Sequence, residues 1–118
     1  MRLTIALLLL LLLPASAQKT VLVVSAGSGD YLMGAGGTLA SLIDQGYAVH
    51  VVQFGNDEKN SVGLSPAQTR LANNTETEHA ARMLGVKEVL NLNHKSGELS
   101  QVSSNEMRNQ IFALIRFY

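Results

Sequence analysis

The chain has 118 residues, nine basic and nine acidic side chains, and a formal net charge of zero. Because the charges are balanced and form no basic cluster, the composition argues against binding to nucleic acid or to an anionic membrane surface. The absence of cysteine excludes disulfides and thiolate metal sites, so packing alone must stabilise the fold.

The beginning of the chain has the pattern of a cleavable signal peptide. Arg2 supplies a positive charge, residues 5–13 form an apolar run of nine, and residues 15–17 (Ala-Ser-Ala) have the small-x-small pattern that signal peptidase reads. Such a run is short of the roughly 20 apolar residues that cross a bilayer. We expect a signal peptide over residues 1–17, export to the periplasm or the exterior, no membrane attachment after cleavage, and one small domain over residues 18–118. The alternative is an uncleaved anchor.

The first half of the mature chain predicts a βαβ unit. Residues 20–25 are continuously apolar and rich in β-branched side chains, which is typical of a buried parallel strand. A helix is predicted over residues 36–45, where apolar side chains recur at helical spacing and Gly46 provides a stop (Leu39, Leu42 and Ile43). Residues 47–54 have the pattern of a second strand.

The second half repeats this alternation. Ser65, Pro66 and Gln68 form a helix-start signature, so a helix is expected over residues 66–84, with an interruption possible at residues 73–75, which are poor helix formers. A third strand is predicted within residues 86–93. A last amphipathic helix follows Ser103, with its apolar side chains on one face (Met107, Ile111, Leu114 and Ile115).

The resulting order, β-α-β-α-β-α, predicts an α/β fold: a Rossmann-like parallel sheet with helices on both faces, in an incomplete, three-stranded form. The glycine-rich segment 26–37 follows the first strand directly, so it is expected at the sheet edge where such folds bind ligands. Gly36, Gly37 and Thr38, at the expected helix N-terminus, form a candidate anion-binding loop. A dinucleotide fingerprint is not met, because Leu32 stands where a third glycine is needed.

Residues 21–26, followed by Gly34-Ala35-Gly36-Gly37-Thr38-Leu39-Ala40, resemble the opening of the PIG-L/LmbE-like zinc-dependent N-deacetylases. In that family the first strand ends in A-H-P-D-D-E and leads into a G-x-G-G-T-L helix. The resemblance covers about residues 19–118 and corresponds to the first half of the family domain. It implies zinc as the cofactor and hydrolysis of an N-acetyl group on a small-molecule amino-sugar conjugate.

Matched to that motif, the chain lacks most of the implied chemistry. Gly27 stands where the family has a metal-binding His, and Gly29 stands where it has the general-base Asp. Asp30 matches the second Asp, a metal ligand. Because a catalytic zinc needs three protein ligands, we assign no catalytic residue and expect that zinc is not retained. His94, which follows the third strand, is a candidate replacement ligand; the alternative is a loop histidine without a metal.

Two charged residues of the helix over 66–84 are candidate substrate contacts by the same resemblance. Glu76 matches by its spacing to the helix end at Leu84, and Arg70 is offset from the usual R-x-x-E-x-x-x-A pattern. The alternative for both is a solvated helix charge.

Three hypotheses for function follow. The first is an exported deacetylase-family protein with impaired activity. The second is a non-catalytic carbohydrate-binding module. The third is a nonfunctional truncated fragment, since no strand follows the last predicted helix. The binding hypothesis requires a stable fold, whereas the fragment hypothesis predicts marginal stability or association through an exposed strand edge.

Overall fold

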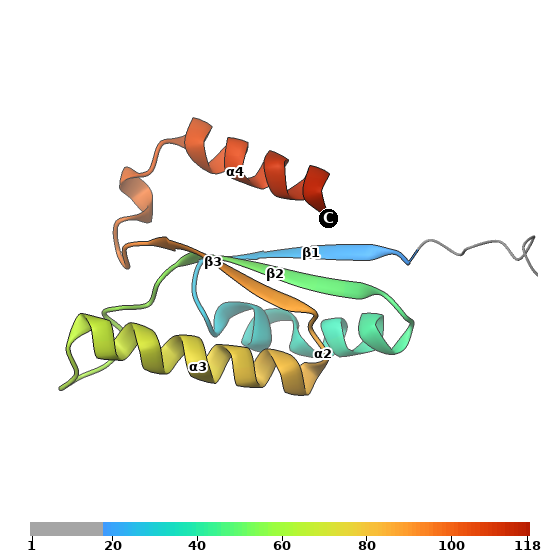
Figure 1. Cartoon of the computed structure of the whole chain (residues 1–118), viewed down its shortest axis with the longest axis horizontal. Coiled ribbons are helices and arrows are strands. Elements are labelled where there is room, and N and C mark those ends of the chain that lie inside the picture. Colours follow the sequence, from blue (N-terminus) through green and yellow to red (C-terminus); the bar gives the residue numbers. More distant parts are fainter. Residues whose placement is uncertain (1–17) are drawn as a thin grey trace, which may run out of the picture.

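The computed structural model describes residues 18–118, so the predicted signal peptide lies outside the described residues. The elements confirm the predicted β-α-β-α-β-α order (Figure 1). Their bounds are β1 Thr20–Ser25, α2 Asp30–Asp44, β2 Ala48–Gly55, α3 Pro66–Leu84, β3 Glu88–His94, a 3-10 turn Leu99–Gln101, and α4 Ser104–Phe117.

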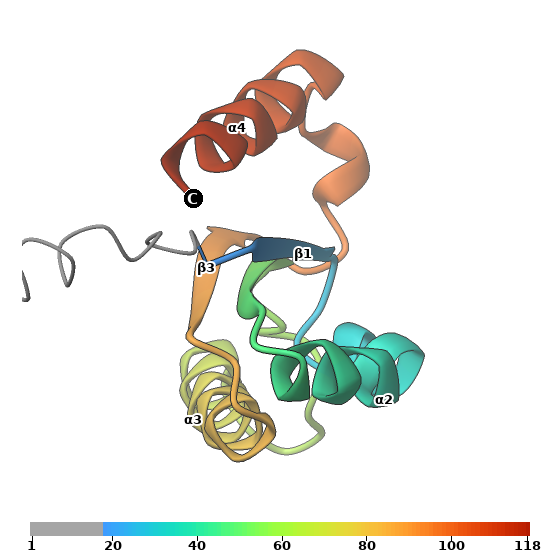
Figure 2. The same ribbon diagram turned by 90° about the vertical axis from the view of Figure 1, so that its right-hand side faces the viewer.

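The three strands form one parallel sheet in the order β1-β2-β3. In its register Val23 of β1 lies beside Val51 of β2, which lies beside Val89 of β3. Helices α2 and α3 cover one face of the sheet, and α4 lies over the other (Figure 2). The predicted Rossmann-like arrangement with helices on both faces is therefore confirmed. The central strand is the most buried, because it has a neighbouring strand on each side and helices over both faces of the sheet.

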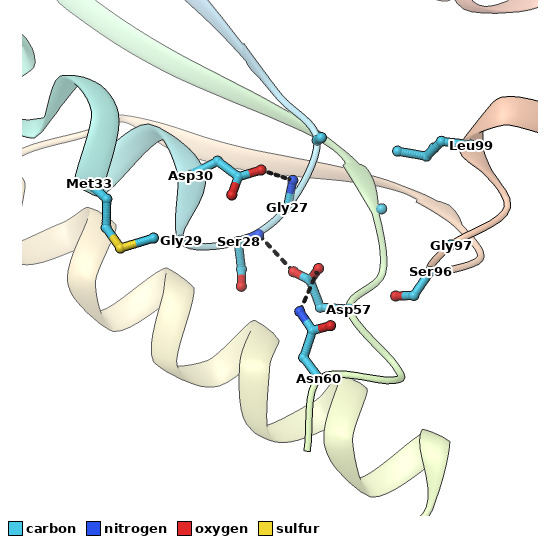
Figure 3. A pocket seen from close by; sticks show the side chains of 12 residues that line it. Gly27, Ser28, Gly29, Asp30, Met33, Asp57, Asn60, Ser96, Gly97 and Leu99 are labelled. Carbon is cyan, nitrogen blue, oxygen red and sulfur yellow. Dashed lines mark hydrogen bonds between the residues drawn. The ribbon is translucent and has the colours of Figure 1, made fainter. Parts of the chain in front are cut away.

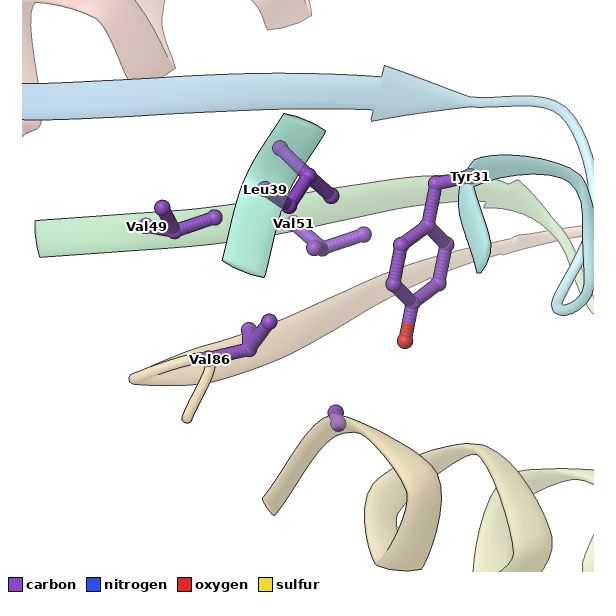
Figure 4. Close-up of a cluster of buried hydrophobic side chains, with 6 residues drawn as sticks. Tyr31, Leu39, Val49, Val51 and Val86 are labelled. Atoms are coloured by element: carbon purple, nitrogen blue, oxygen red, sulfur yellow. The ribbon is translucent and has the colours of Figure 1, made fainter. Parts of the chain in front are cut away.

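The core lies between the sheet and the helices α2 and α3 (Figure 4). Its buried members come from α2, β2, α3 and the connection between α3 and β3 (Tyr31, Leu39, Val49, Val51, Ala81 and Val86). Tyr31 stands where the resembled motif has a Glu, and burial raises the pKa of its hydroxyl above the usual value. This position therefore contributes an aromatic ring to the core and presents no carboxylate to the sheet edge.

Helix α2 begins at Asp30, which corrects the predicted start at Gly36. The Asp30 carboxylate in the first turn favours a helix N-terminus there, because it complements the helix dipole. Gly36, Gly37 and Thr38 consequently lie inside the helix, beyond the first turn whose N–H groups are free of intrahelical bonds. The expected helix N-terminus at these three residues was therefore wrong, and anion binding there stays a prediction without that support.

Helix α3 starts with the predicted capping box, in which Ser65 and Gln68 bond reciprocally. It continues without interruption through residues 73–75, which are poor helix formers. Hydrogen bonds to other elements explain this continuity: the Asn73 side chain donates to the backbone carbonyl of Asp57 at 3.0 Å, and Asn91 of β3 donates to the Asn74 side chain at 3.2 Å. Tertiary contacts thus outweigh weak helix propensity.

Helix α4 begins at the predicted cap, where the Ser103 hydroxyl accepts a hydrogen bond from the Glu106 N–H. Its half-buried apolar side chains share one face, whereas three other apolar side chains are exposed (Phe112, Ile115 and Phe117). Among residues 18–118, every helix is too short or too polar to traverse a bilayer.

Candidate functional site

A pocket of about 450 Å³ opens at the carboxyl edge of the sheet, where the loops after the three strands meet (Figure 3). The first loop and the start of α2 supply residues 26–30, the second loop supplies Asp57 and Asn60, and the third supplies Ser96 and Leu99. This is the edge at which open α/β sheets bind ligands. The position therefore agrees with the expectation from the glycine-rich segment.

Asp57 is a buried carboxylate in the wall of this pocket, with 6% of its surface exposed. Its Oδ2 accepts hydrogen bonds from the Ser28 N–H at 2.7 Å and from Gln53 Nε2 at 2.9 Å. Its Oδ1 accepts one from Asn60 Nδ2 at 3.1 Å. The backbone of Asp57 has a φ of 53°, in the left-handed region, so this side chain is held at a strained position by three donors.

Asp30 approaches the same place from the first turn of α2. Its Oδ2 accepts a hydrogen bond from the Gly27 N–H at 2.8 Å. A Cβ built on Gly27 would lie 3.1 Å from Asp57 Oδ1 and 3.3 Å from Asp30 Oδ2. A carboxylate from α2 and one from the loop after β2 therefore converge on Gly27, which has no side chain.

Asn56 and Gly55 fix the second and third loops to their neighbours. Asn56 Oδ1 accepts a hydrogen bond from the Ser96 N–H at 3.2 Å. The Gly55 N–H donates to the Ala26 carbonyl at 2.8 Å, and a Cβ on Gly55 would lie 2.7 Å from that oxygen. Only glycine allows this approach of the first two loops.

The two candidate metal ligands from the sequence are not brought together. The His94 ring stacks on Phe54 at a centroid distance of 5.7 Å, and its Nε2 lies at hydrogen-bond distance, 3.1 Å, from Gln110 Oε1 of α4. Asp30 lines the pocket, whereas His94 does not. Replacement of the missing ligand by His94 remains a prediction without a supporting contact.

The residues present do not fit the zinc that the resembled family implies. Gly27 and Gly29 have no side chain to offer, and residues 18–118 contain no group of three or more His, Cys, Asp or Glu side chains placed to hold a metal ion. A catalytic zinc needs three protein ligands and one open position. Asp30 supplies one.

Glu76 and Arg70, the candidate substrate contacts, lie in different surroundings. Glu76 lines a neighbouring hollow of about 240 Å³ that it shares with Ser28 and Gly29, so it stands across the first loop from the pocket. Arg70 is exposed on α3 and lines neither hollow. Glu76 is therefore placed to reach a ligand that extends over Gly29, and both roles remain predictions.

The charged side chains that line the pocket are acidic. Its lining contains Asp30 and Asp57 and no Lys, Arg or His. Lys59 lies beside it, with its Nζ 4.0 Å from the point where a Cβ on Gly97 would stand. Such a lining favours ligands that donate hydrogen bonds or carry positive charge, and it disfavours anions.

Sequence reasoning found Asp30 and missed Asp57. One signal was available, because Asn56 and Asp57 directly follow the second predicted strand. Polar residues at that point of a parallel strand lie at the ligand-binding edge.

Comparison with known proteins gives a consistent result. The profile of the PIG-L family, GlcNAc-PI de-N-acetylase, matches residues 22–118. The fold is similar to that of N,N'-diacetylchitobiose deacetylase from Pyrococcus horikoshii, determined in complex with its inhibitor (TM-score 0.77, 30% identity, 87% of this chain and 39% of that chain). It is also similar to GalB, the 4-carboxy-2-hydroxymuconate hydratase from Pseudomonas putida (TM-score 0.63, 30% identity, 75% of this chain and 39% of that chain).

A 4-oxalmesaconate hydratase of Pseudomonas putida is 37% identical over 75 residues, which are 58% of this chain and 29% of that protein. The chain thus spans less than half the length of each of these relatives.

Proposed function

Because the chain belongs to the PIG-L family, we propose that its pocket binds a small-molecule amino-sugar conjugate and that zinc-dependent removal of an N-acetyl group is impaired in it. One observation carries this proposal. The pocket lies at the carboxyl edge of the sheet and is lined by the carboxylate of Asp30, but Gly27 and Gly29 provide no side chain to it.

The polarity of the pocket supports an amino-sugar ligand. Sugar hydroxyls and an ammonium group donate hydrogen bonds, and the carboxylates of Asp30 and Asp57 are acceptors. The apolar side chains of Met33 and Leu99 add surface for the less polar side of a sugar ring. A structural relative named for its action on N,N'-diacetylchitobiose points to the same substrate class.

A second candidate is hydration of an unsaturated acid, because two similar proteins are named as hydratases. The name of the GalB substrate, 4-carboxy-2-hydroxymuconate, describes an acid with several carboxylates. A lining with two carboxylates and no basic side chain repels such an anion. The charge of the pocket therefore favours the amino sugar.

The missing side chains account for the impaired hydrolysis. Amide hydrolysis at neutral pH needs an activated water and a general base. Gly27 and Gly29 occupy the positions at which the family resemblance puts a metal ligand and that base. The presence of a pocket at this edge of the sheet supports a binding role. Export through the signal peptide over residues 1–17 is part of the same proposal.

The experiment measures acetate release from N,N'-diacetylchitobiose by the exported protein, with and without added zinc, and glucosamine binding by calorimetry. We expect measurable glucosamine binding and no acetate release above background. Zinc-dependent acetate release that is lost in Asp30→Ala and kept in Asp44→Ala would overturn the proposal of impaired hydrolysis. Asp44 is a suitable control because it is exposed at the other end of α2.

A further inference from the structure

Gly27 and Asp57 share one space in the pocket wall. The contact of 3.1 Å between a Cβ built on Gly27 and Asp57 Oδ1 is tighter than ordinary van der Waals contact. A side chain at position 27 would therefore press on the carboxylate of Asp57. The bare backbone of Gly27 leaves room for this carboxylate.

The hydrogen bonds of Asp57 leave one acceptor direction open. Oδ2 accepts from Ser28 and Gln53, whereas Oδ1 accepts from Asn60 alone among residues 18–118. A carboxylate oxygen has two lone pairs, so Oδ1 retains one. Oδ1 lies beside Gly27 in the wall of the pocket, where this lone pair is available to a ligand that donates a hydrogen bond (Figure 3).

Asp57 is also pre-organised. Its backbone strain at a φ of 53° persists because hydrogen bonds from three residues fix its side chain. A ligand that bonds to Oδ1 therefore does not have to order this group. Pre-organisation of this kind strengthens binding because little conformational entropy remains to be lost.

From these contacts we infer that Asp57 is the ligand-binding carboxylate of the pocket, in the wall beside Gly27. Its Oδ1 accepts a hydrogen bond from a hydroxyl or ammonium group of the ligand. The identity of the ligand as an amino sugar rests on the proposed function.

The first arm of the test measures whether the two residues share this space. Melting temperatures are compared for the intact chain, Gly27→Ala, Asp57→Gly and the double variant. Asp57→Gly is chosen because glycine adopts a positive φ without strain. We expect Gly27→Ala to lower the melting temperature by several degrees in the wild-type background and by clearly less beside Asp57→Gly, where only the 3.3 Å contact with Asp30 Oδ2 remains. An equal decrease in both backgrounds would contradict the shared space.

The second arm measures glucosamine affinity by calorimetry. We expect about tenfold weaker binding for Asp57→Asn and for Asp57→Gly, which corresponds to a lost hydrogen bond to a charged group. The control Asp44→Asn should bind as the wild type does. Unchanged affinity in both Asp57 variants would overturn the inference while the proposed function stands. Zinc-dependent acetate release together with Asp57-dependent binding would overturn the proposed impairment and leave the inference intact. No binding by the wild type would overturn both.

Discussion

The Ser28 N–H donates a 2.7 Å hydrogen bond to the Asp57 carboxylate and thereby joins the loop after β1 to the loop after β2. Gln53, itself 1% exposed, donates to the same oxygen. One buried carboxylate thus accepts from the loop after β1 and from β2. Without it, the Ser28 N–H would lose its acceptor, and Gln53 Nε2 would keep only its hydrogen bond to the Gly55 carbonyl, which is unfavourable.

Asp57→Ala should therefore destabilise the fold. Loss of the acceptor leaves the side-chain amide of Gln53 buried without this partner, and we expect a decrease of about 2–4 kcal/mol in the free energy of unfolding. Urea unfolding measures it, with the exposed Asp44→Ala as the control. A change in Asp57→Ala that is no larger than in the control would show that these hydrogen bonds contribute little to stability.

Two glycine substitutions should have opposite effects. In Gly55→Ala the new methyl group would lie 2.7 Å from the Ala26 carbonyl, so the two loops must separate and stability falls. In Gly37→Ala the methyl group enters open space on the exposed side of α2, and helix propensity predicts a gain of about 0.5–1 kcal/mol. Melting temperatures of the two variants, compared with that of the wild type, test both expectations. Stabilisation by Gly55→Ala would contradict the close contact of the loops.

The end of α4 should detach from the sheet at high pH. The Tyr118 hydroxyl donates to Glu88 Oε2 at 2.5 Å, and this hydrogen bond, with burial and the charge of Glu88, raises the pKa of Tyr118 from 10.0 to about 12. A raised pKa means that the protonated form is favoured in the folded state. The contribution of this hydrogen bond to the stability of the fold is complete below pH 10.0 and is lost as the pH rises through about 12.

A titration of tyrosinate absorbance in wild type and Tyr118→Phe tests this. The difference between the two curves should contain one group that ionises near pH 12. In Glu88→Gln the same group should ionise at lower pH. Ionisation of Tyr118 near pH 10.0 in the wild type would contradict the hydrogen bond.

The outer edge of β1 should promote self-association. Within residues 18–118, β1 pairs with β2 alone, and its Val24 is 47% exposed. Exposed apolar edge strands pair with other chains, and a lysine at such an edge prevents this. We expect Val24→Lys to lower the apparent mass in sedimentation at high protein concentration. Val62→Lys, in a loop where the side chain is fully exposed, should leave the mass unchanged. Equal behaviour of the two variants would exclude the β1 edge as the contact.

Local signals explain which parts of the fold the sequence predicts. The strands and the starts of α3 and α4 depend on apolar runs and capping residues near one another, such as Ser65 with Gln68, and these predictions were confirmed. The start of α2 was predicted too late because glycines usually weaken helices, whereas Asp30 in the first turn favours the earlier start.

The site was only partly predictable for a similar reason. Asp30 lies in a recognisable motif, but the contact of Asp57 with Gly27 joins residues of two loops that meet in space. No spacing in the sequence indicates that the side chain missing from one loop is replaced by a carboxylate from the other.

The most direct test of the binding pocket is an NMR titration of the ¹⁵N-labelled chain with glucosamine. We predict that the backbone N–H signals of Gly27 and Ser28 and the side-chain amide of Asn60 shift in a saturable manner, since all three surround the two carboxylates. The N–H signals of Val86 and Lys87, in a separate hollow, should not move. Saturable shifts confined to that other hollow, or none at all, would contradict a sugar-binding pocket at the carboxyl edge of the sheet.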